Sequence, residues 1–266
     1  MPSSNGVFLS AAGKVALITG GSRGIGAATV KMFCAAGARV AFSYQKARSS
    51  AEAVISGCGA QVCAGIQSEL SSVHDAEKLV SATVARFGRL DCLVVNHGIW
   101  PPNDVAVDEM TEDQWRQTSA INLDSVFGLI KYSVAQMKRE GRKGADQTAG
   151  RIVIVSSTAG QRGEAFHCDY AATKGAVISM VKGLSTELAR DRIYANCVAP
   201  GWVATDMSAP AMDDPQTRDR VLATIPLGRI GKPEEIAAPI LFLCTEHAGF
   251  ITGEIMNVNG GAVLVG

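Results

Sequence analysis

Several common sequence features are missing here, and each absence excludes a class of protein. No stretch approaches the roughly 18 consecutive apolar residues that a membrane-spanning helix needs. Residues 1–13 are small and polar, with no basic start and no apolar run, so we expect a polar tail and not a secretory signal. The 25 basic and 25 acidic residues cancel, which leaves no global field to attract nucleic acid or an anionic membrane surface.

Signatures of metal sites and disulfide frameworks are also missing. The seven cysteines are an odd number without a Cys-x-x-Cys pair, and the four histidines are dispersed with no His-Glu-x-x-His motif. We therefore expect buried, reduced thiols in a cytoplasmic protein, with neither disulfides nor a bound metal.

What the sequence has in quantity is apolar residues and glycine. Of its 266 residues, 47% are apolar and 28 are glycine, whereas only 19% are charged. This composition supports a sizeable buried core and argues against disorder. The length suits one large α/β domain, and we expect a single domain over residues 1–266.

Apolar runs typical of strands alternate with helical segments along the chain. The expected strands lie at 14–19, 39–44, 60–66, 90–95, 150–155, 193–198 and 254–258. The expected helices lie at 24–36, around 51–54, and at 73–87, 110–137, 170–189 and 234–244, and residues 139–150 are expected to form a surface loop. Strands that are apolar throughout and alternate with helices are typical of a parallel sheet covered on both faces. We predict a doubly wound, Rossmann-type sheet of about seven strands, with ligands at the carboxyl ends of the strands.

A glycine-rich turn joins the first expected strand to the first expected helix. It runs Gly20-Gly21-Ser22-Arg23-Gly24-Ile25-Gly26. A dinucleotide pyrophosphate binds backbone N–H groups at a helix N-terminus, and glycines let the backbone approach it closely. We interpret the turn as a cofactor site, although glycine also serves the geometry of tight strand-to-helix turns.

The end of the second strand bears on the choice of cofactor. An NAD enzyme places a carboxylate there on the ribose hydroxyls. This chain instead has Ser43-Tyr44-Gln45, followed by Lys46 and Arg48. The missing acid and the available bases, with Arg23 in the turn, favour the 2′-phosphate of NADP(H). NAD(H) is the less favoured alternative, in which Lys46 and Arg48 are solvated loop charges.

Tyr170 and Lys174 stand four residues apart, on one face of a helix. A free phenol has a pKa near about 10, too high for efficient acid–base catalysis at neutral pH, and a nearby ammonium should lower it. This spacing alone is common by chance. Ser157 adds context, because it follows the buried strand 150–155 at the ligand-binding edge. Its hydroxyl could donate to a substrate carbonyl oxygen as hydride arrives, or it could simply cap the strand end.

Taken together, these residues resemble the short-chain dehydrogenase/reductase family in its single-domain form, from about residue 14 to residue 262. The motifs are independent and stand in the family's order, and the type they suggest is a 3-oxoacyl-reductase-like carbonyl reductase. The resemblance implies that Ser157, Tyr170 and Lys174 are catalytic. It also implies that Asn122 is the helix asparagine that helps to hold a water linking the lysine to solvent.

The resemblance further implies a set of cofactor contacts. Glu69-Leu70 stands where the family has an Asp-Val pair against the adenine, and residues 200–205 match the segment that covers the nicotinamide. The full set comprises Gly20, Ser22, Arg23, Gly24, Ile25, Gly26, Tyr44, Lys46, Glu69, Leu70, Asn96, Gly98, Tyr170, Lys174, Pro200, Gly201, Val203 and Thr205.

One departure from the family pattern follows the fourth strand. The family has Asn-Asn-Ala-Gly there, whereas this chain has Val95-Asn96-His97-Gly98. The first asparagine normally ties neighbouring strands together, so Val95 should weaken that bonding or replace it with packing. His97 either touches cofactor or substrate or is a packed spacer.

By this interpretation the chain transfers a hydride between NADP(H) and a ketone or secondary alcohol. Ser157 would hold the oxygen while Tyr170 donates the proton. Two alternatives stay open: an NAD-dependent dehydrogenase of a sugar or steroid alcohol, and a catalytically silent NADP(H)-sensing protein. The second alternative gives no reason for the whole catalytic set to be present.

The substrate itself is not identified by the sequence. The candidate substrate residues are Trp100, Ser157, His167 and Trp202. The aromatic side chains, with Phe166, suggest an apolar or aromatic ketone, although each could equally belong to the core or an interface. Glu164, His167 and Asp169 keep a polar acyl or keto-ester substrate open. The family usually forms tetramers, so the resemblance implies a homotetramer, or a dimer, and the apolar end 262–265 is consistent with this.

Overall fold

In this computed structural model, the described residues, 8–141 and 147–265, are built around a seven-stranded sheet in the order β3-β2-β1-β4-β5-β6-β7. All six neighbouring pairs are parallel. The strands are β1 (Val15–Ile18), β2 (Arg39–Tyr44), β3 (Cys63–Gln67), β4 (Cys92–Val95), β5 (Gly150–Val155), β6 (Ile193–Pro200) and β7 (Ile255–Val258). The predicted doubly wound parallel sheet is confirmed. Its order reverses between β1 and β4, which is where such sheets bind ligands.

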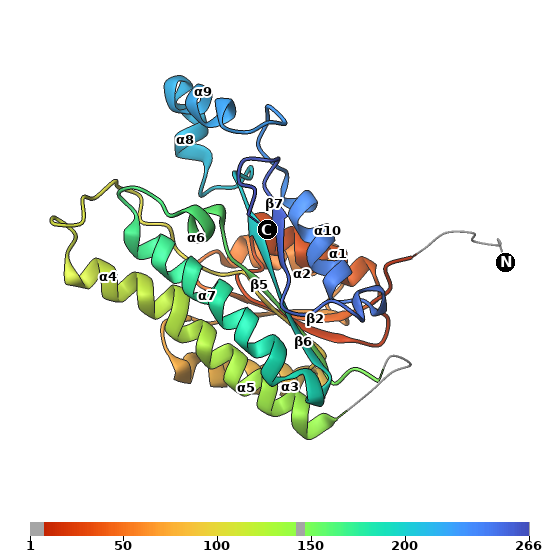
Figure 1. Ribbon diagram of the computed structural model, residues 1–266. Coiled ribbons are helices and arrows are strands. Elements are labelled where there is room, and N and C mark those ends of the chain that lie inside the picture. Colours follow the sequence, from red (N-terminus) through yellow and green to blue (C-terminus); the bar gives the residue numbers. More distant parts are fainter. Residues whose placement is uncertain (1–7, 142–146, 266) are drawn as a thin grey trace.

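Helices cover both faces of the sheet (Figure 1). One face carries α3 (Val73–Phe87), α5 (Ser125–Glu140) and α7 (Cys168–Glu187), and the other carries α1 (Gly24–Ala35), α2 (Arg48–Cys58) and α10 (Pro233–Leu243). The remaining helices are α4 (Glu112–Ser119), α6 (Thr158–Arg162), α8 (Ala209–Asp213) and α9 (Pro215–Ala223), with a π-helical turn at Ala120–Asp124 and 3₁₀ turns at Ala189–Asp191 and Glu246–Ala248. None of the helices within the described ranges is long and apolar enough to cross a membrane.

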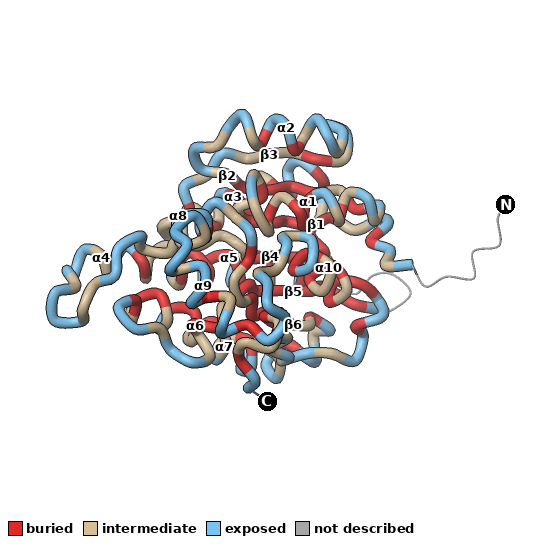
Figure 2. Tube along the Cα trace, turned by 90° about the horizontal axis from the view of Figure 1, so that it is seen from above, coloured by how far each residue is buried: buried red, intermediate tan, exposed pale blue. Residues whose placement is uncertain are grey.

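The apolar strands supply two cores at once. Val15 and Leu17 of β1 pack into the core beneath α3, α5 and α7, whereas Ala16 and Ile18 pack into the core beneath α1, α2 and α10. Successive side chains of a strand point to opposite faces, so a strand covered on both sides must be apolar throughout. Figure 2 shows the result, with buried residues concentrated along the strands and exposed ones on the outer sides of the helices.

Some element predictions were wrong in detail. The continuous helix expected at 110–137 is divided into α4, the π-helical turn and α5. The third strand begins at Cys63 and not at residue 60, because Gly59 ends α2 and its carbonyl accepts the Val62 and Cys63 amides in a turn. Helices α6, α8 and α9 were not expected. Of the predicted loop at 139–150, residues 142–146 lie outside the described residues, as do residues 1–7 of the predicted tail.

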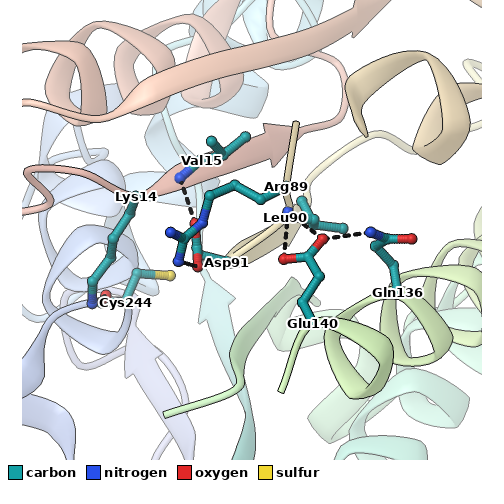
Figure 3. Close-up of polar contacts among 8 residues, drawn as sticks. All are labelled: Lys14, Val15, Arg89, Leu90, Asp91, Gln136, Glu140 and Cys244. Carbon is teal, nitrogen blue, oxygen red and sulfur yellow. Dashed lines mark hydrogen bonds and ion pairs between the residues drawn. The ribbon is translucent and has the colours of Figure 1, made fainter. Parts of the chain in front are cut away.

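A polar network lies at the amino edge of the sheet (Figure 3). The Asp91 carboxylate, just before β4, accepts the Val15 amide at 2.8 Å and pairs with the Arg89 guanidinium. The Glu140 carboxylate at the end of α5 accepts the Leu90 amide at 3.1 Å. These bonds satisfy backbone donors where strands begin, and they join β1, β4 and α5.

Candidate active site

The predicted site residues gather at the opposite, carboxyl edge of the sheet, around the point where strand order reverses. The glycine-rich turn follows β1, Asn96 follows β4, Ser157 follows β5, and residues 200–205 span the end of β6 and the loop after it. The first turns of α7 bring Tyr170 to the same edge. Parallel strands end together, so residues distant in sequence meet here, as predicted.

The glycine-rich turn has a backbone that only glycine accommodates well. Gly20 and Gly24 have φ of +66° and +51°. A Cβ at Gly26 would lie 2.0 Å from the Gly20 carbonyl oxygen. Among the described residues, none caps the first amides of helix α1 with its side chain, and the first turn of the helix has no acid. These backbone N–H groups at a helix N-terminus have the chemistry that a pyrophosphate requires, so the residues present fit a dinucleotide.

Two polar residues, Thr19 and Ser43, fix this turn, and neither was among the predicted contacts. The Ser43 hydroxyl accepts the Gly20 amide at 3.1 Å, and the Thr19 hydroxyl accepts the Asn96 amide at 3.0 Å. The Asn96 side-chain amide in turn donates to the Thr19 carbonyl at 3.0 Å. The Asn96 side chain therefore anchors the turn. Hydroxyl residues at the ends of two buried strands were the available sequence signal.

His97 is a bridge between elements. Its Nδ1 lies 2.8 Å from the Thr19 hydroxyl oxygen, and its Nε2 lies 2.8 Å from the Ser125 hydroxyl oxygen at the start of α5. Burial, with a smaller contribution from the Lys174 ammonium, lowers the pKa of His97 to about 3. Both ring nitrogens are therefore occupied within the protein and the ring is neutral, which favours the packed spacer of the two open interpretations.

Val95 is fully packed, with 1% of its surface exposed, in the core beneath α3, α5 and α7. The bonding that the family's first asparagine would provide is thus replaced by packing. The strand ends β1 and β4 are joined by Thr19, whose amide donates to the Val94 carbonyl at 3.0 Å.

Tyr170 and Ser157 face each other at the centre of the site. Ser157 caps α6, because its hydroxyl oxygen accepts the Ala159 amide at 3.1 Å. Burial raises the pKa of Tyr170 to about 12, and a hydrogen bond with the Ser157 hydroxyl acts against this rise. The cap interpretation of Ser157 is confirmed, with α6 as the element that it caps, and the hydroxyl also lies within hydrogen-bond reach of the tyrosine. Its role as a donor to a substrate oxygen stays a prediction.

Lys174 lies beneath the tyrosine, with its Nζ 5.7 Å from the centre of the Tyr170 ring. The Lys174 ammonium donates to the Val155 carbonyl at 3.0 Å, and burial lowers the pKa of Lys174 to about 8. The expectation that this ammonium lowers the tyrosine pKa is wrong for this geometry. Burial of the phenol raises the tyrosine pKa, and the ammonium is directed at a strand carbonyl.

Asn122 lies in the π-helical turn, with 1% of its surface exposed. Its side-chain oxygen accepts the Ile99 amide at 2.8 Å, and its side-chain nitrogen donates to the Ile99 carbonyl at 3.0 Å and the Thr173 hydroxyl at 3.3 Å. A Cβ at Gly98 would lie 3.1 Å from the Asn122 oxygen and 3.4 Å from the Lys174 nitrogen. Glycine at position 98 thus permits the close approach of the asparagine and the lysine.

An aromatic wall flanks the tyrosine. The Trp100 ring stacks on His167 at 3.8 Å and meets the Tyr170 ring edge-on at 4.8 Å. His167 is 2% exposed and its Nε2 lies 3.0 Å from the Pro101 carbonyl oxygen. Two predicted substrate residues are therefore brought together beside Tyr170. Among the described residues, Trp202 makes no ring contact with this wall, and its carbonyl accepts the Gly231 amide at 2.8 Å.

The acidic side chains that suggested a polar substrate already bond to other groups of the protein. The Asp169 carboxylate is fully buried and accepts the Thr118 hydroxyl at 2.8 Å and the Tyr170 amide at 2.8 Å. It joins α4 to the first turn of α7. Glu164 pairs with Arg162 at 2.6 Å. Neither carboxylate is free to bind a substrate without giving up a bond.

The basic residues expected at the adenosine end are partly paired. Arg23 contacts Asp206 at 2.8 Å, and Arg48 contacts Glu52 at 2.9 Å. Lys46 is exposed. Glu69 accepts the Gln45 side-chain amide at 3.1 Å, so a carboxylate does lie against the end of β2. Leu70 is 7% exposed and belongs to the core.

The remaining predicted cofactor residues line this same edge. Thr205 lies against the glycine turn, since a Cβ at Gly24 would be 3.0 Å from its methyl group. The Gly201 amide donates to the Val258 carbonyl at 3.2 Å, and Val203 is 6% exposed in the second core. Ser22, Ile25 and Tyr44 are half-buried at this edge. Pro200 is buried at the end of β6.

The seven cysteines are all free in the part of the chain that the structure describes. Cys34, Cys58 and Cys168 are only half-buried, so the expectation of uniformly buried thiols is wrong for these three. The other four are buried.

Comparisons with known proteins agree with this architecture. A family model described as enoyl-(acyl carrier protein) reductase matches residues 20–263. A 3-oxoacyl-[acyl-carrier-protein] reductase of Synechocystis sp. is 36% identical over 255 residues, which cover 94% of this chain and 97% of that protein.

Solved structures are similar over the same length. A Brucella melitensis protein described as a short-chain dehydrogenase/reductase, glucose/ribitol dehydrogenase, is 36% identical with a TM-score of 0.86, and the match covers 97% of this chain and 99% of that one. A Pseudomonas aeruginosa structure described as an RhlG/NADP active-site complex is 32% identical with a TM-score of 0.87 and the same coverage. The matched lengths and identities assign the family, and this chain belongs to the short-chain dehydrogenase/reductases.

Proposed function

We propose that this protein is an NADP(H)-dependent carbonyl reductase that acts on the ketone of a 3-oxoacyl thioester. The observation that carries the proposal is the meeting of Ser157, Tyr170 and Lys174 beside an uncapped helix N-terminus, at the point where strand order reverses. The 3-oxoacyl substrate class is supported by the Synechocystis relative, which is described as a 3-oxoacyl-[acyl-carrier-protein] reductase.

The proposed mechanism assigns each step of proton handling to a residue of this chain. The nicotinamide, when bound, supplies the hydride. The Ser157 hydroxyl donates to the substrate oxygen and holds it beside the phenol, and Tyr170 Oη delivers the proton to that oxygen. With its pKa at about 12, Tyr170 is fully protonated at neutral pH, which suits the reducing direction.

Lys174 and Asn122 would position the cofactor and the loop after β4, and would help to return a proton to Tyr170. Lys174 is the only one of the proposed catalytic groups that carries a charge at neutral pH, and its ammonium is within reach of both the tyrosine ring and the loop at Gly98. Asn122 bonds Ile99 and Thr173, and so fixes the loop after β4 against α7. We propose that the cofactor ribose binds Lys174 and that protons reach the tyrosine through it.

NADP(H) is the proposed cofactor. The first amides of α1 would hold the pyrophosphate, while Arg23 and Lys46 would bind the 2′-phosphate. The Arg23–Asp206 pair is exposed on both sides, at 61% and 71%, so exchanging the carboxylate for a phosphate costs little. Support also comes from the Pseudomonas relative, whose structure is described as an NADP complex.

We propose one domain, which assembles into a homotetramer or dimer. Large apolar side chains stay exposed on α4 and α5 (Trp115, 45%; Phe127, 49%) and towards the C-terminus (Phe250, 105%; Leu264, 86%), where burial by another copy would stabilise them. Seven free thiols support a reducing, cytoplasmic setting.

The test is an absorbance assay at the nicotinamide band with acetoacetyl-CoA as the 3-oxoacyl thioester. We expect turnover with NADPH, at least tenfold lower efficiency with NADH, and nearly complete loss of turnover in Tyr170→Phe, which should still bind NADPH. Arg23→Ala and Lys46→Ala should weaken NADPH binding and leave NADH binding unchanged.

Other outcomes would select the alternatives. Preferential oxidation of a sugar or steroid alcohol with NAD would contradict the proposed cofactor and substrate. NADPH binding without turnover of any carbonyl compound would indicate a sensing protein. Substantial reductase activity in Tyr170→Phe would remove the tyrosine from the mechanism.

A further inference from the structure

Three cysteines that are far apart in sequence meet at the edge of the sheet. Cys34 is in the last turn of α1, Cys58 ends α2, and Cys63 begins β3. Their Sγ atoms all lie within 4.8 Å of one another. The chain reverses direction between α2 and β3 at Gly59, which has φ of +93°. The Gly59 carbonyl accepts the Cys63 amide at 3.0 Å. This turn brings the thiols of Cys58 and Cys63 together against α1.

The spacing of the sulfurs suits a shared ion. Three thiolates bound at about 2.3 Å to one Zn²⁺ are separated from each other by about 3.8–4.0 Å. The cluster therefore needs to contract by at most about 1 Å. A disulfide would use two of the three thiols and leave the third without a role, whereas an ion uses all three.

The surroundings also favour a cation that prefers sulfur. Helices α1 and α2 both end at the cluster, and the C-terminus of a helix carries partial negative charge. Cys34 and Cys58 are half-buried and Cys63 is buried, so an ion can reach the cluster from the solvent side.

We propose that Cys34, Cys58 and Cys63 form a three-thiolate site for a soft metal ion such as Zn²⁺. The site joins the ends of α1 and α2 to the first residue of β3. It lies at the amino end of β3, whereas the catalytic residues lie at the carboxyl edge of the sheet. The bound ion therefore stabilises the fold and takes no part in hydride transfer. The dispersed cysteine positions had led us to expect no metal.

The experiment uses Cd²⁺ as a spectroscopic probe. Full-length protein is reduced, freed of metal with a chelator and titrated with Cd²⁺, while thiolate-to-metal absorption is followed in the ultraviolet. We expect one equivalent to bind, and Cys34→Ser and Cys58→Ser each to lose at least tenfold in affinity. Cys168→Ser removes another half-buried thiol outside the cluster and should bind as the unaltered protein does. Retained NADPH binding shows that each variant is folded.

A second measurement follows stability with Zn²⁺. The ion should raise the Tm of the unaltered protein by several degrees and leave the Tm of Cys58→Ser unchanged, because only the folded cluster binds it. The proposal is overturned if the reduced protein takes up no Cd²⁺, or if both serine variants bind it as well as the unaltered protein. A disulfide between two of these thiols that forms equally well in the presence of Zn²⁺ would also overturn it.

Discussion

At the amino edge of the sheet, charged side chains bond to one another and to strand amides. At the carboxyl edge, glycines, hydroxyls and side-chain amides surround backbone N–H groups that can still bind a ligand. Asp91 and Glu140 each accept a backbone N–H where β4 begins. At the other edge the first amides of α1 have no side-chain cap within the described chain. Charge at the amino edge is used to satisfy the backbone, and the carboxyl edge leaves backbone donors for a ligand.

The difference between the edges predicts which substitutions cost activity and which cost stability. Groups at the carboxyl edge are held by short hydrogen bonds to neighbouring loops, so their loss changes the geometry of the site more than the fold. Groups at the amino edge are part of the fold itself.

Among the substitutions that compare the two edges, Ser157→Ala should have the largest effect on activity. It removes the proposed donor to the substrate oxygen, for which loss of about 10²–10³-fold in kcat is expected. It also removes the cap of α6, which costs about 1 kcal/mol of stability. Ser72→Ala removes the equivalent cap of α3 and is the matched control, expected to lose stability but not kcat. A Ser157→Ala protein with unchanged kcat would show that this serine is only a cap.

Asp91→Ala should have the largest effect on stability. The Val15 amide and the Arg89 guanidinium would both lose the Asp91 carboxylate. Because the Val15 amide is buried and the Arg89 side chain is 34% exposed, we expect a cost of about 2 kcal/mol. We expect a lower midpoint in urea unfolding, with kcat per folded molecule unchanged. Asp91→Asn keeps an acceptor and should lose less. A large fall in kcat without loss of stability would contradict the division between the two edges.

The fold was largely readable from the sequence because its periodicity is imposed by burial on both faces. The bounds of β2, β5 and α3 match the predicted segments, since each is delimited by a clear change in apolar pattern. The π-helical turn at Ala120–Asp124 was not predicted, because apolar spacing barely differs between a continuous helix and one with a single wide turn. The short helix α6 depends on the Ser157 cap and has almost no pattern of its own.

The site was predictable as a set of residues but not as an electrostatic arrangement. Strand order alone brings Ser157 and Tyr170 to one edge. The pKa of Tyr170 depends on how deeply the phenol is buried, which no local pattern records. Likewise, the orientation of Asp169 towards α4 and the meeting of Cys34 with Cys63 arise from contacts between elements.

His97 should give the carboxyl edge a measurable dependence on acid. Burial lowers its pKa to about 3, whereas in the unfolded chain it titrates near about 6.5. Between these values the unfolded state binds a proton that the folded state does not, so stability is full above about pH 6.5 and falls as pH drops towards 3. The expected slope is at most about 1.4 kcal/mol per pH unit.

Urea unfolding of the unaltered protein and of His97→Ala measures this contribution. The measurements run from roughly pH 4 to roughly pH 7, a range that contains the ordinary pKa of histidine. His97→Ala should be less stable at pH 7, because it loses the bridge between Thr19 and Ser125, yet its stability should fall less steeply with acid. His247→Ala changes an exposed histidine and should keep the steep slope. Equal slopes in all three proteins would contradict a buried, neutral His97.

Glu140→Gln should have the smallest effect and tests whether the amino edge needs charge or only an acceptor. The glutamine can still accept the Leu90 amide, which the glutamate now accepts at 3.1 Å, but its contact with Gln136 loses a charged partner. Hydrogen bonds to charged groups are stronger than neutral ones by roughly 1 kcal/mol, so we expect a loss of about that size in urea unfolding and no change in kcat. If Glu140→Gln were as destabilising as Asp91→Ala, the negative charge itself, and not the satisfied strand amide, would hold the amino edge together.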